Sequence, residues 1–285
     1  MNADRRDAPW PTASSQVVGV MGDPVSHSLS PLLHNAAFAT VGLDWVSVAF
    51  AVPRGALEEA VAGLRALGIR GASVTMPHKI DASRLVDRLS PTADALGAVN
   101  CLVFEHGTLV GHNTDGEGFL EALRRGAGFD PAGRRCLVAG TGGAARAVVL
   151  ALAREGAAEV VVVGRTPGHA EAAAALAGGT GRVGVAGDAA GAELVVDATP
   201  VGMAGAADLV PLVDPGLLHP GQVAADLVYE PRVTRWLGEA VSRGALGVGG
   251  LGMLVHQAAA QLALWTGHPA PVETMWAAAQ AVGPG

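Results

Sequence analysis

The sequence predicts an α/β protein made of two units, each with a parallel sheet covered by helices. Apolar runs typical of strands alternate with segments whose apolar residues recur at helical spacing, the pattern of parallel sheets with helical crossovers. The chain has 285 residues, and at about 150 residues per domain this length favours two domains. A Gly-rich loop near the middle lies between a strand and a helix, which indicates a nucleotide-binding unit in the second half.

The first unit follows a polar, Pro-containing arm at residues 1–15, which we expect to be disordered. Ser30 and Pro31 predict a helix start, with the serine as N-cap and the proline at the first helical position. Gly68 predicts the end of the helix over 54–67, and Pro77 predicts the end of the strand over 71–76. The expected elements are strand 16–21, helix 30–41, strand 45–51, helix 54–67, strand 71–76, helix 80–89 and a hairpin of 100–104 with 108–110.

The second unit repeats this alternation. Its expected elements are helix 115–125, strand 136–139, helix 144–154, strand 159–163, helix 167–177, strands 182–186, 193–197 and 222–227, helix 231–243 and strand 245–248. The tail is helical over 251–265 and 271–281, and we expect it to fold back on the first unit. We therefore predict one domain over residues 16–114 plus 250–285, and a second domain over residues 115–249.

Composition excludes several classes of protein. Half of the residues are hydrophobic and 16% are charged, so the chain is not disordered. Lys and Arg number 19 against 26 Asp and Glu, and the net charge of −7 argues against binding to nucleic acid or anionic membranes. No apolar run reaches the ~18 residues of a membrane span, and the start lacks the hydrophobic stretch of a secretory signal. The two cysteines, Cys101 and Cys136, indicate a reduced compartment, so we expect a cytoplasmic protein.

The Gly-rich loop predicts a dinucleotide site. Gly140, Gly142 and Gly143 follow a strand, and Ala144 opens a helix, in the G-x-G-x-x-G/A form with Ala145 in the last place. The glycines permit a tight turn and let backbone N–H groups approach a pyrophosphate at the positive end of the helix. The alternative is a turn that serves only helix–strand packing.

Arg165 and Thr166 follow the next strand and bear on the choice of cofactor. NAD-preferring sites usually have an Asp or Glu about 20 residues after the loop, which binds the ribose 2′-hydroxyl. No acid stands here, and the arginine offers a charge partner for a 2′-phosphate, which favours NADP. The alternative is an ordinary solvated cation in a loop.

Lys79 is the only lysine, beside eighteen arginines. Arginine keeps its proton in proteins whereas lysine releases it in suitable surroundings, so a lone lysine points to a place where arginine does not serve. Lys79 comes just after a strand, at the ligand end of a parallel sheet, and Asp115 is an acid available to pair with it. The alternatives are a chance surface lysine and a helix start in which Thr114 and Glu117 form a capping box.

Other polar residues have two interpretations each. Ser28 and Ser30 are placed to donate to a carboxylate at a helix N-terminus, although Ser30 is also the best N-cap. Asn100 fits a turn equally well, and Tyr229, the only tyrosine, fits a packing role. Gln257 and Gln261 share a helix face and suit either a ligand or a buried hydrogen-bonded pair. The histidines lack metal-ligand spacing, so no metal is expected.

Taken together, the motifs resemble those of the shikimate dehydrogenase family over nearly the whole length after residue 15. Seven segments match in order: GDPVSHSLSP at 22–31, SVTMPHK at 73–79, GAVN at 97–100, NTDG at 113–116, GTGGAAR at 140–146, DATPVGM at 197–203 and GLGMLVHQAA at 250–259. The resemblance implies an N-terminal substrate-binding domain, a Rossmann-like NADP-binding domain and an active site in the cleft between them. It also implies an NADP-dependent reduction of 3-dehydroshikimate to shikimate in aromatic amino-acid biosynthesis, by a monomer or a homodimer.

The resemblance further implies a role for each matching residue. Lys79 and Asp115 would form the catalytic pair, and Ser28 and Ser30 would hold the substrate carboxylate. The residues implied near the substrate ring are Thr75, Asn100, Tyr229 and Gln257. Those implied at the cofactor are Gly140, Gly142, Gly143, Ala144, Arg165, Thr166, Leu227 and Gly250.

The chain departs from the family pattern at three positions. Ser73 stands where Asn is frequent, Gly164 where an Asn often precedes the Arg-Thr pair, and His169 where a second cation often clamps the 2′-phosphate. Quinate and aminoshikimate dehydrogenases share most of these motifs and are the alternatives within the family. A non-catalytic nucleotide-sensing module is the alternative outside it, and such a module would lack the pair of Lys79 and Asp115.

Overall fold

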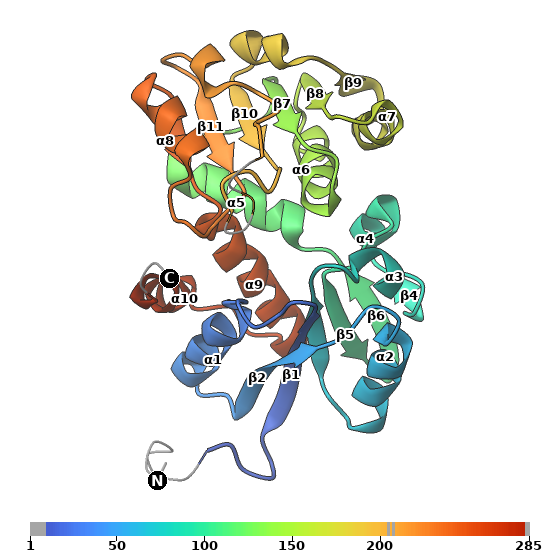
Figure 1. The fold of residues 1–285 in the computed structure, drawn as a ribbon. Helices are drawn as coiled ribbons and strands as arrows, with labels where there is room; N and C mark the ends of the chain where they lie inside the picture. Colours follow the sequence, from blue (N-terminus) through green and yellow to red (C-terminus); the bar gives the residue numbers. More distant parts are fainter. Residues whose placement is uncertain (1–9, 204–205, 207–208, 283–285) are drawn as a thin grey trace.

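The computed structural model describes residues 10–203, 206 and 209–282, which form two lobes (Figure 1). Each lobe contains one six-stranded sheet. The chain passes from the first sheet to the second through α5 (Asp115–Ala127) and returns through α9 (Leu251–Thr266). These two helices lie at the junction between the lobes. Residues 1–9 of the predicted arm lie outside the described residues, and residues 12–15 form a turn in which Ser15 Oγ donates to Asp44 Oδ1 at 2.6 Å.

The strands of the first sheet are β1 (Gln16–Gly22), β2 (Trp45–Ala51), β3 (Gly71–Val74), β4 (Arg88–Leu89), β5 (Cys101–Glu105) and β6 (Thr108–His112). Their order is β2-β1-β3-β5-β6-β4. Strands β2, β1 and β3 are parallel, whereas β5 pairs antiparallel with β3 and β6. The predicted hairpin is confirmed, but it makes this sheet mixed, so the prediction of a wholly parallel first sheet is wrong.

The helices of the first lobe are α1 (Ser30–Val41), α2 (Leu57–Ala66), α3 (Lys79–Ala82), α4 (Pro91–Leu96), α9 and α10 (Val272–Ala281). The tail helices α9 and α10 pack on α1, as predicted. The helix predicted over 80–89 is wrong. It stops at Ala82 because the following residues add the short strand β4 beside β6, and Ser90 then caps α4 by accepting a hydrogen bond from Ala93 N.

The strands of the second sheet are β7 (Arg135–Ala139), β8 (Glu159–Val163), β9 (Gly181–Val183), β10 (Leu194–Asp197), β11 (Val223–Asp226) and β12 (Leu246–Val248). They are all parallel, in the order β12-β11-β10-β7-β8-β9. The covering elements are α6 (Gly143–Arg154), α7 (Pro167–Ala174), α8 (Arg235–Ser242) and the short 3₁₀ helices Ala175–Thr180, Ala186–Gly191 and Pro215–Leu217. Both faces are covered, which explains why the central strands are continuous apolar runs.

Helices α5 and α9 cross at close range because Gly118 has no side chain. A Cβ atom at this position would lie 2.6 Å from Gln257 N and 2.8 Å from Met253 O. This contact joins the first helix of the second lobe to the helix that returns to the first lobe. The junction is therefore built from backbone packing rather than from a flexible linker.

The described residues contain no helix that is long and apolar enough to cross a membrane. Within the same residues, no group of three His, Cys, Asp or Glu side chains is arranged to hold a metal ion. Cys101 and Cys136 are buried, unbonded thiols.

Candidate active site

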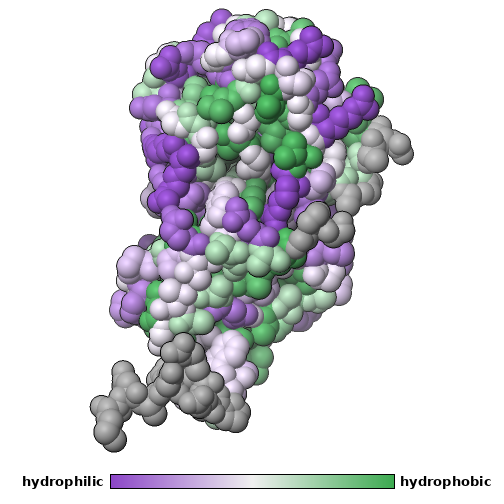
Figure 2. Space-filling model, turned by 90° about the vertical axis from the view of Figure 1, so that its left-hand side faces the viewer, coloured by the Kyte–Doolittle hydropathy of each residue, from purple (hydrophilic) through white to green (hydrophobic). Residues whose placement is uncertain are grey.

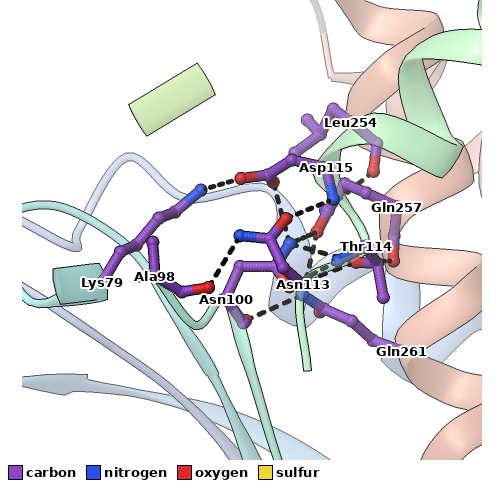
Figure 3. A network of polar contacts seen from close by, with 9 residues as sticks. All are labelled: Lys79, Ala98, Asn100, Asn113, Thr114, Asp115, Leu254, Gln257 and Gln261. Carbon is purple, nitrogen blue, oxygen red and sulfur yellow. Dashed lines mark hydrogen bonds and ion pairs between the residues drawn. The ribbon is translucent and has the colours of Figure 1, made fainter. Parts of the chain in front are cut away.

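Lys79 and Asp115 form an ion pair at the junction of the lobes (Figure 3). Lys79 begins α3, shortly after β3, and Asp115 begins α5. The Lys79 Nζ lies 2.5 Å from Asp115 Oδ2, and the side chains are 22% and 6% exposed respectively. The pair thus combines a buried carboxylate with an amine that solvent or a ligand can reach, an arrangement suited to proton transfer.

Asn100 holds the second oxygen of the Asp115 carboxylate. Its Nδ2 donates to Asp115 Oδ1 at 2.8 Å and to Thr114 Oγ1 at 3.0 Å, and its Oδ1 accepts from Thr114 N at 2.8 Å. Asn100 is 1% exposed, so its side chain belongs to a buried network and not to a surface turn. Both carboxylate oxygens of Asp115 are therefore fixed, one by Asn100 and one by Lys79.

Gln257 and Gln261 of α9 are a buried, hydrogen-bonded pair. Gln261 Nε2 donates to Gln257 Oε1 at 2.9 Å and to the Asn100 carbonyl at 3.0 Å, and Gln257 Nε2 donates to Leu254 O at 2.9 Å. The pairing alternative for these residues is confirmed, and Figure 3 shows both amides in the network around Asn100. The network connects the first sheet, the start of α5 and helix α9.

Two capping interpretations are wrong. Thr114 is the N-cap residue of α5, but it makes no side-chain cap; its hydroxyl instead donates to Gln257 O at 3.1 Å. The competing demand of the buried network explains why no capping box with Glu117 forms. Ser30 is the first residue of α1 and not its N-cap, a position that Leu29 occupies without a side-chain cap.

Ser28, Ser30 and Thr75 lie beyond the C-terminal ends of β1 and β3. Ser28 Oγ accepts a hydrogen bond from Ser30 N at 3.3 Å, and Ser30 is buried without capping α1. Thr75 donates its backbone N–H to Met21 O at 2.9 Å, and its methyl group occupies the space that a Cβ on Gly22 would need. None of the three hydroxyls joins the network of Asp115, so each stays available to a ligand.

The Gly-rich loop has the geometry that a pyrophosphate needs. Gly140 has φ of +123°, and a Cβ there would lie 2.8 Å from Ala198 O, so only glycine fits. Gly142 and Gly143 have open space where a Cβ would stand. Helix α6 starts at Gly143 without a side-chain cap, which leaves the first N–H groups, including that of Ala144, free for an anion.

Arg165 and Thr166 lie beside this loop. Gly164, which precedes them, approaches the loop so closely that a Cβ would lie 2.6 Å from the Thr141 methyl group. Arg165 is exposed and forms no ion pair or hydrogen bond within the described part of the chain. A free guanidinium next to the pyrophosphate loop fits a 2′-phosphate. His169 is also exposed, two residues into α7.

Leu227, Tyr229 and Gly250 lie at the C-terminal edge of the second sheet. Leu227 N donates to Asp197 O at 3.0 Å, and Gly250 N donates to Val228 O at 3.2 Å. Tyr229 is half-buried, and burial raises the pKa of its phenol. The structure thus puts these residues at the same sheet edge as the Gly-rich loop, but none of them bonds to the Lys79 network.

Sequence reasoning gave no role to Asn113, although it fixes the helix start. Asn113 Oδ1 accepts from Asp115 N at 3.1 Å, and its Nδ2 donates to Ala98 O at 3.1 Å. Three polar residues in succession before an amphipathic helix were the available signal. A buried polar network is not distinguishable from a surface turn in a sequence, because both use Asn and Thr.

Two models of protein families match the two segments of the chain that build the first lobe. Residues 20–102 match the model of the shikimate dehydrogenase substrate binding domain, and residues 250–280 match the shikimate 5′-dehydrogenase C-terminal domain. The shikimate dehydrogenase (NADP(+)) of Methanopyrus kandleri is 48% identical over 92% of this chain and 94% of its own.

Two solved structures have the same fold. A crystal structure of a shikimate dehydrogenase in complex with NADP+ has a TM-score of 0.89 and 37% identity, covering 94% of this chain and 96% of that one. The shikimate 5-dehydrogenase of Thermus thermophilus in complex with NADP(H) and shikimate has a TM-score of 0.87 and 39% identity, covering 93% and 99%.

Proposed function

The chain belongs to the shikimate dehydrogenase family, and we propose that it catalyses the reversible, NADP-dependent reduction of 3-dehydroshikimate to shikimate in aromatic amino-acid biosynthesis. The observation that carries this proposal is the ion pair of Lys79 and Asp115, 2.5 Å apart between the substrate-binding lobe and the lobe with the dinucleotide loop. A module that only senses nucleotides has no need for such a pair. The reaction class is therefore an NADP-dependent oxidoreduction of a ring alcohol.

The cofactor, when bound, supplies or accepts the hydride. The proton that is also exchanged in the reaction is transferred by this chain's own residues. In the direction of oxidation, the Lys79 amine accepts the proton of the ring hydroxyl, and in the direction of reduction its ammonium returns a proton to the carbonyl oxygen. Asp115 stabilises the ammonium form and keeps Nζ directed into the junction, because Asn100 fixes the carboxylate from the other side.

The other site residues have proposed roles in binding. Ser28 and Ser30 bind the substrate carboxylate near the N-terminus of α1, supported by hydroxyls that cap no helix. The residues proposed to contact or orient the ring hydroxyls are Thr75, Asn100, Tyr229 and Gln257. The residues proposed to bind NADP are Gly140, Gly142, Gly143, Ala144, Arg165, Thr166, Leu227 and Gly250.

The domain division and the cellular setting belong to the same proposal. Residues 16–114 plus 250–285 form the substrate-binding domain, and residues 115–249 form the NADP-binding domain; the two separate sheets support this division. A net charge of −7 supports a protein that binds neither nucleic acid nor anionic membranes. We infer a cytoplasmic monomer or homodimer.

An absorbance assay at about 340 nm, where NADPH but not NADP+ absorbs, tests the function. Purified protein is incubated with shikimate or quinate, each with NADP+ or NAD+. We expect the largest kcat/KM with shikimate and NADP+. A larger kcat/KM with quinate would assign the chain to the quinate branch of the family, and no turnover with any pair would contradict the proposal.

A further inference from the structure

Two carboxylic acids are buried side by side in the second sheet, at the C-terminal ends of β10 and β11. Asp197 and Asp226 are direct register partners in these parallel strands, and each is 1% exposed. Because residues two apart in a strand share a face, both side chains lie on the face of Val195 and Ala224, which α8 covers. Neither acid has a role in the reaction described above.

The two acids differ in their hydrogen bonds. Asp226 is satisfied, because its Oδ1 accepts from Val228 N at 2.9 Å and its Oδ2 accepts from the Thr234 hydroxyl. Asp197 Oδ1 accepts from the N–H and the hydroxyl of Thr199 at 2.9 and 2.6 Å. Asp197 Oδ2 is buried without a partner, the one carboxylate oxygen in this condition among the described residues.

No cation among the described residues acts on either acid. Asp226 is the one charged group that acts on the Asp197 carboxyl within the described chain. The charged residues on the elements that cover the pair form no ion pair with it; they are Glu230, Arg232, Arg235 and Glu239. Two ionised carboxylates in such surroundings repel each other and lack solvation, so a proton on one of them is favoured.

The unpartnered oxygen identifies where that proton resides. A proton on Asp197 Oδ2 gives this atom a hydrogen to donate, whereas every oxygen of Asp226 already accepts one. The electrostatics agree: burial, helped by the charge of Asp226, raises the pKa of Asp197 to about 6, although the hydrogen bonds from Thr199 act in the opposite direction. Burial also raises the pKa of Asp226, while its hydrogen bonds from Thr234 and Val228 lower it.

The pair supports the segment of Leu227 and Tyr229, which we propose to lie near substrate and cofactor. Leu227 N donates to the Asp197 carbonyl, and Val228 N donates to the Asp226 carboxylate. Val228 O in turn accepts from Gly250 N, at the start of α9. Leu227, Tyr229 and Gly250 therefore depend for their positions on two adjacent buried acids.

We propose that buried Asp197 takes up a proton in mild acid beside the carboxylate of Asp226, and that this acid–carboxylate pair is a positioning device for the segment of Leu227 and Tyr229. Its link to ligand binding rests on the proposed function, whereas its effect on stability does not. Loss of the proton places two charges in one buried site and loosens the segment. Affinity for NADP+ therefore depends on pH through a group that touches neither ligand.

The direction of the pH dependence follows from the raised pKa. Asp197 has a pKa of about 6 in the folded protein against an ordinary value of 3.8, so the folded protein holds an extra proton between about pH 4 and 6. The stabilising contribution of this proton is complete below about pH 4, declines across the window and is lost above about pH 6.

Asp197→Asn tests the proposal, because asparagine has the shape of the protonated acid and donates a hydrogen bond at every pH. The measurements are the thermal midpoint and the Kd for NADP+, by tryptophan fluorescence, at pH 5 and pH 8. At pH 5 folded Asp197 is mostly protonated, so we expect similar Kd values for variant and wild type, and a smaller difference in thermal midpoint than at pH 8. At pH 8 we expect the variant to melt higher and to bind NADP+ about threefold to tenfold more tightly than wild type. The ionisation of the cofactor phosphate affects both proteins equally, so it cancels in the ratio of their Kd values.

Two further variants complete the test. Asp188→Asn is the matched control, since Asp188 pairs with Arg182 in the same lobe and should lose stability at both pH values. Asp226→Asn removes the neighbouring charge. In this variant the change of thermal midpoint with pH should therefore occur at lower pH than in wild type. If Asp197→Asn melts lower than wild type by the same amount at pH 5 and pH 8, the proposal that Asp197 is protonated in mild acid is overturned. A higher melting point at pH 8 with no change in relative Kd would overturn the positioning role, and inactivity towards shikimate would affect only the proposed function.

Discussion

At the scale of single residues, one carboxylate organises the site. Asp115 receives Lys79 on one oxygen and Asn100 on the other, and its backbone N–H is held by Asn113. Because these hydrogen bonds fix Asp115, its carboxylate cannot rotate away from the Lys79 amine. The position of Lys79 Nζ is consequently set by the network and not by the flexible lysine chain.

Lys79→Arg keeps the positive charge and removes the ability to transfer a proton. We expect kcat to fall by about 10²-fold or more, with a much smaller change in KM, because general acid–base catalysis is lost while charge recognition stays. Steady-state assays with shikimate and NADP+ measure both constants. A variant with near-normal kcat would make Lys79 a binding charge and would contradict the mechanism.

Ser28 and Ser30 give a prediction that separates binding from stability. Because Ser30 caps no helix in the structure, Ser30→Ala should leave the thermal midpoint nearly unchanged, whereas Ser28→Ala also removes the hydrogen bond that Ser28 Oγ accepts from Ser30 N. The KM for shikimate should rise by about tenfold, the scale of one lost hydrogen bond to a charged group, while the Kd for NADP+ stays constant. The opposite result, a stability loss of about 1 kcal/mol with unchanged KM, would restore the capping role.

At the scale of elements, the contact of α5 with α9 determines where Gln257 lies. Gly118→Ala would place a methyl group within 2.6–2.8 Å of the α9 backbone. We expect a loss of about 1–3 kcal/mol in the free energy of unfolding, and a raised KM for shikimate because α9 must move. Urea denaturation measures the first and steady-state kinetics the second.

Gly63→Ala is the matched control for this prediction. Gly63 lies inside α2, and nothing stands within 4 Å of its missing Cβ. This substitution should stabilise the protein by about 0.5–1 kcal/mol, because alanine loses less backbone entropy in a helix. If Gly118→Ala behaved like this control, the crossing of α5 and α9 would not depend on glycine.

The elements of the second lobe were more predictable than those of the first. Its parallel strands are buried on both faces, so each is a short apolar run such as Val160–Val163 between turn signals. The first lobe contains short elements fixed by tertiary pairing: Arg88 and Leu89 become a strand only because β6 lies beside them. The Gly-rich loop, Lys79 and Asp115 were recognisable from local patterns. The links of Asn100 to Gln257 and Gln261 join residues about 160 positions apart, which no local pattern encodes.

At the scale of the whole molecule, the two lobes respond to acid in opposite ways. Asp197 in the second lobe gains its proton below about pH 6, whereas His34 in the first lobe is buried in its neutral form. Burial lowers the pKa of His34 to about 4 from its ordinary value of 6.5. Mild acid therefore favours one lobe and weakens the other.

His34→Gln tests the acid response of the first lobe. Between pH 6.5 and 4 the unfolded chain binds a proton at His34 and the folded protein does not. The free energy of unfolding therefore decreases as the pH is lowered through this range. The shift corresponds to a loss of about 3 kcal/mol by pH 4. We expect the variant to lose less stability than wild type over this range in urea denaturation, and His169→Gln, at an exposed position, to lose the same amount as wild type. Equal losses in all three proteins would contradict the prediction.

Lys79 and Tyr229 are each the sole residue of their kind, and they lie in different lobes on either side of the junction. Protein grown with isotope-labelled lysine and fluorinated tyrosine would therefore give one lysine signal and one tyrosine signal in magnetic resonance spectra. The first signal reports on the substrate side and the second on the edge of the nucleotide sheet. The composition of the chain thus supplies a separate spectroscopic reporter for each lobe without any change to the amino-acid sequence.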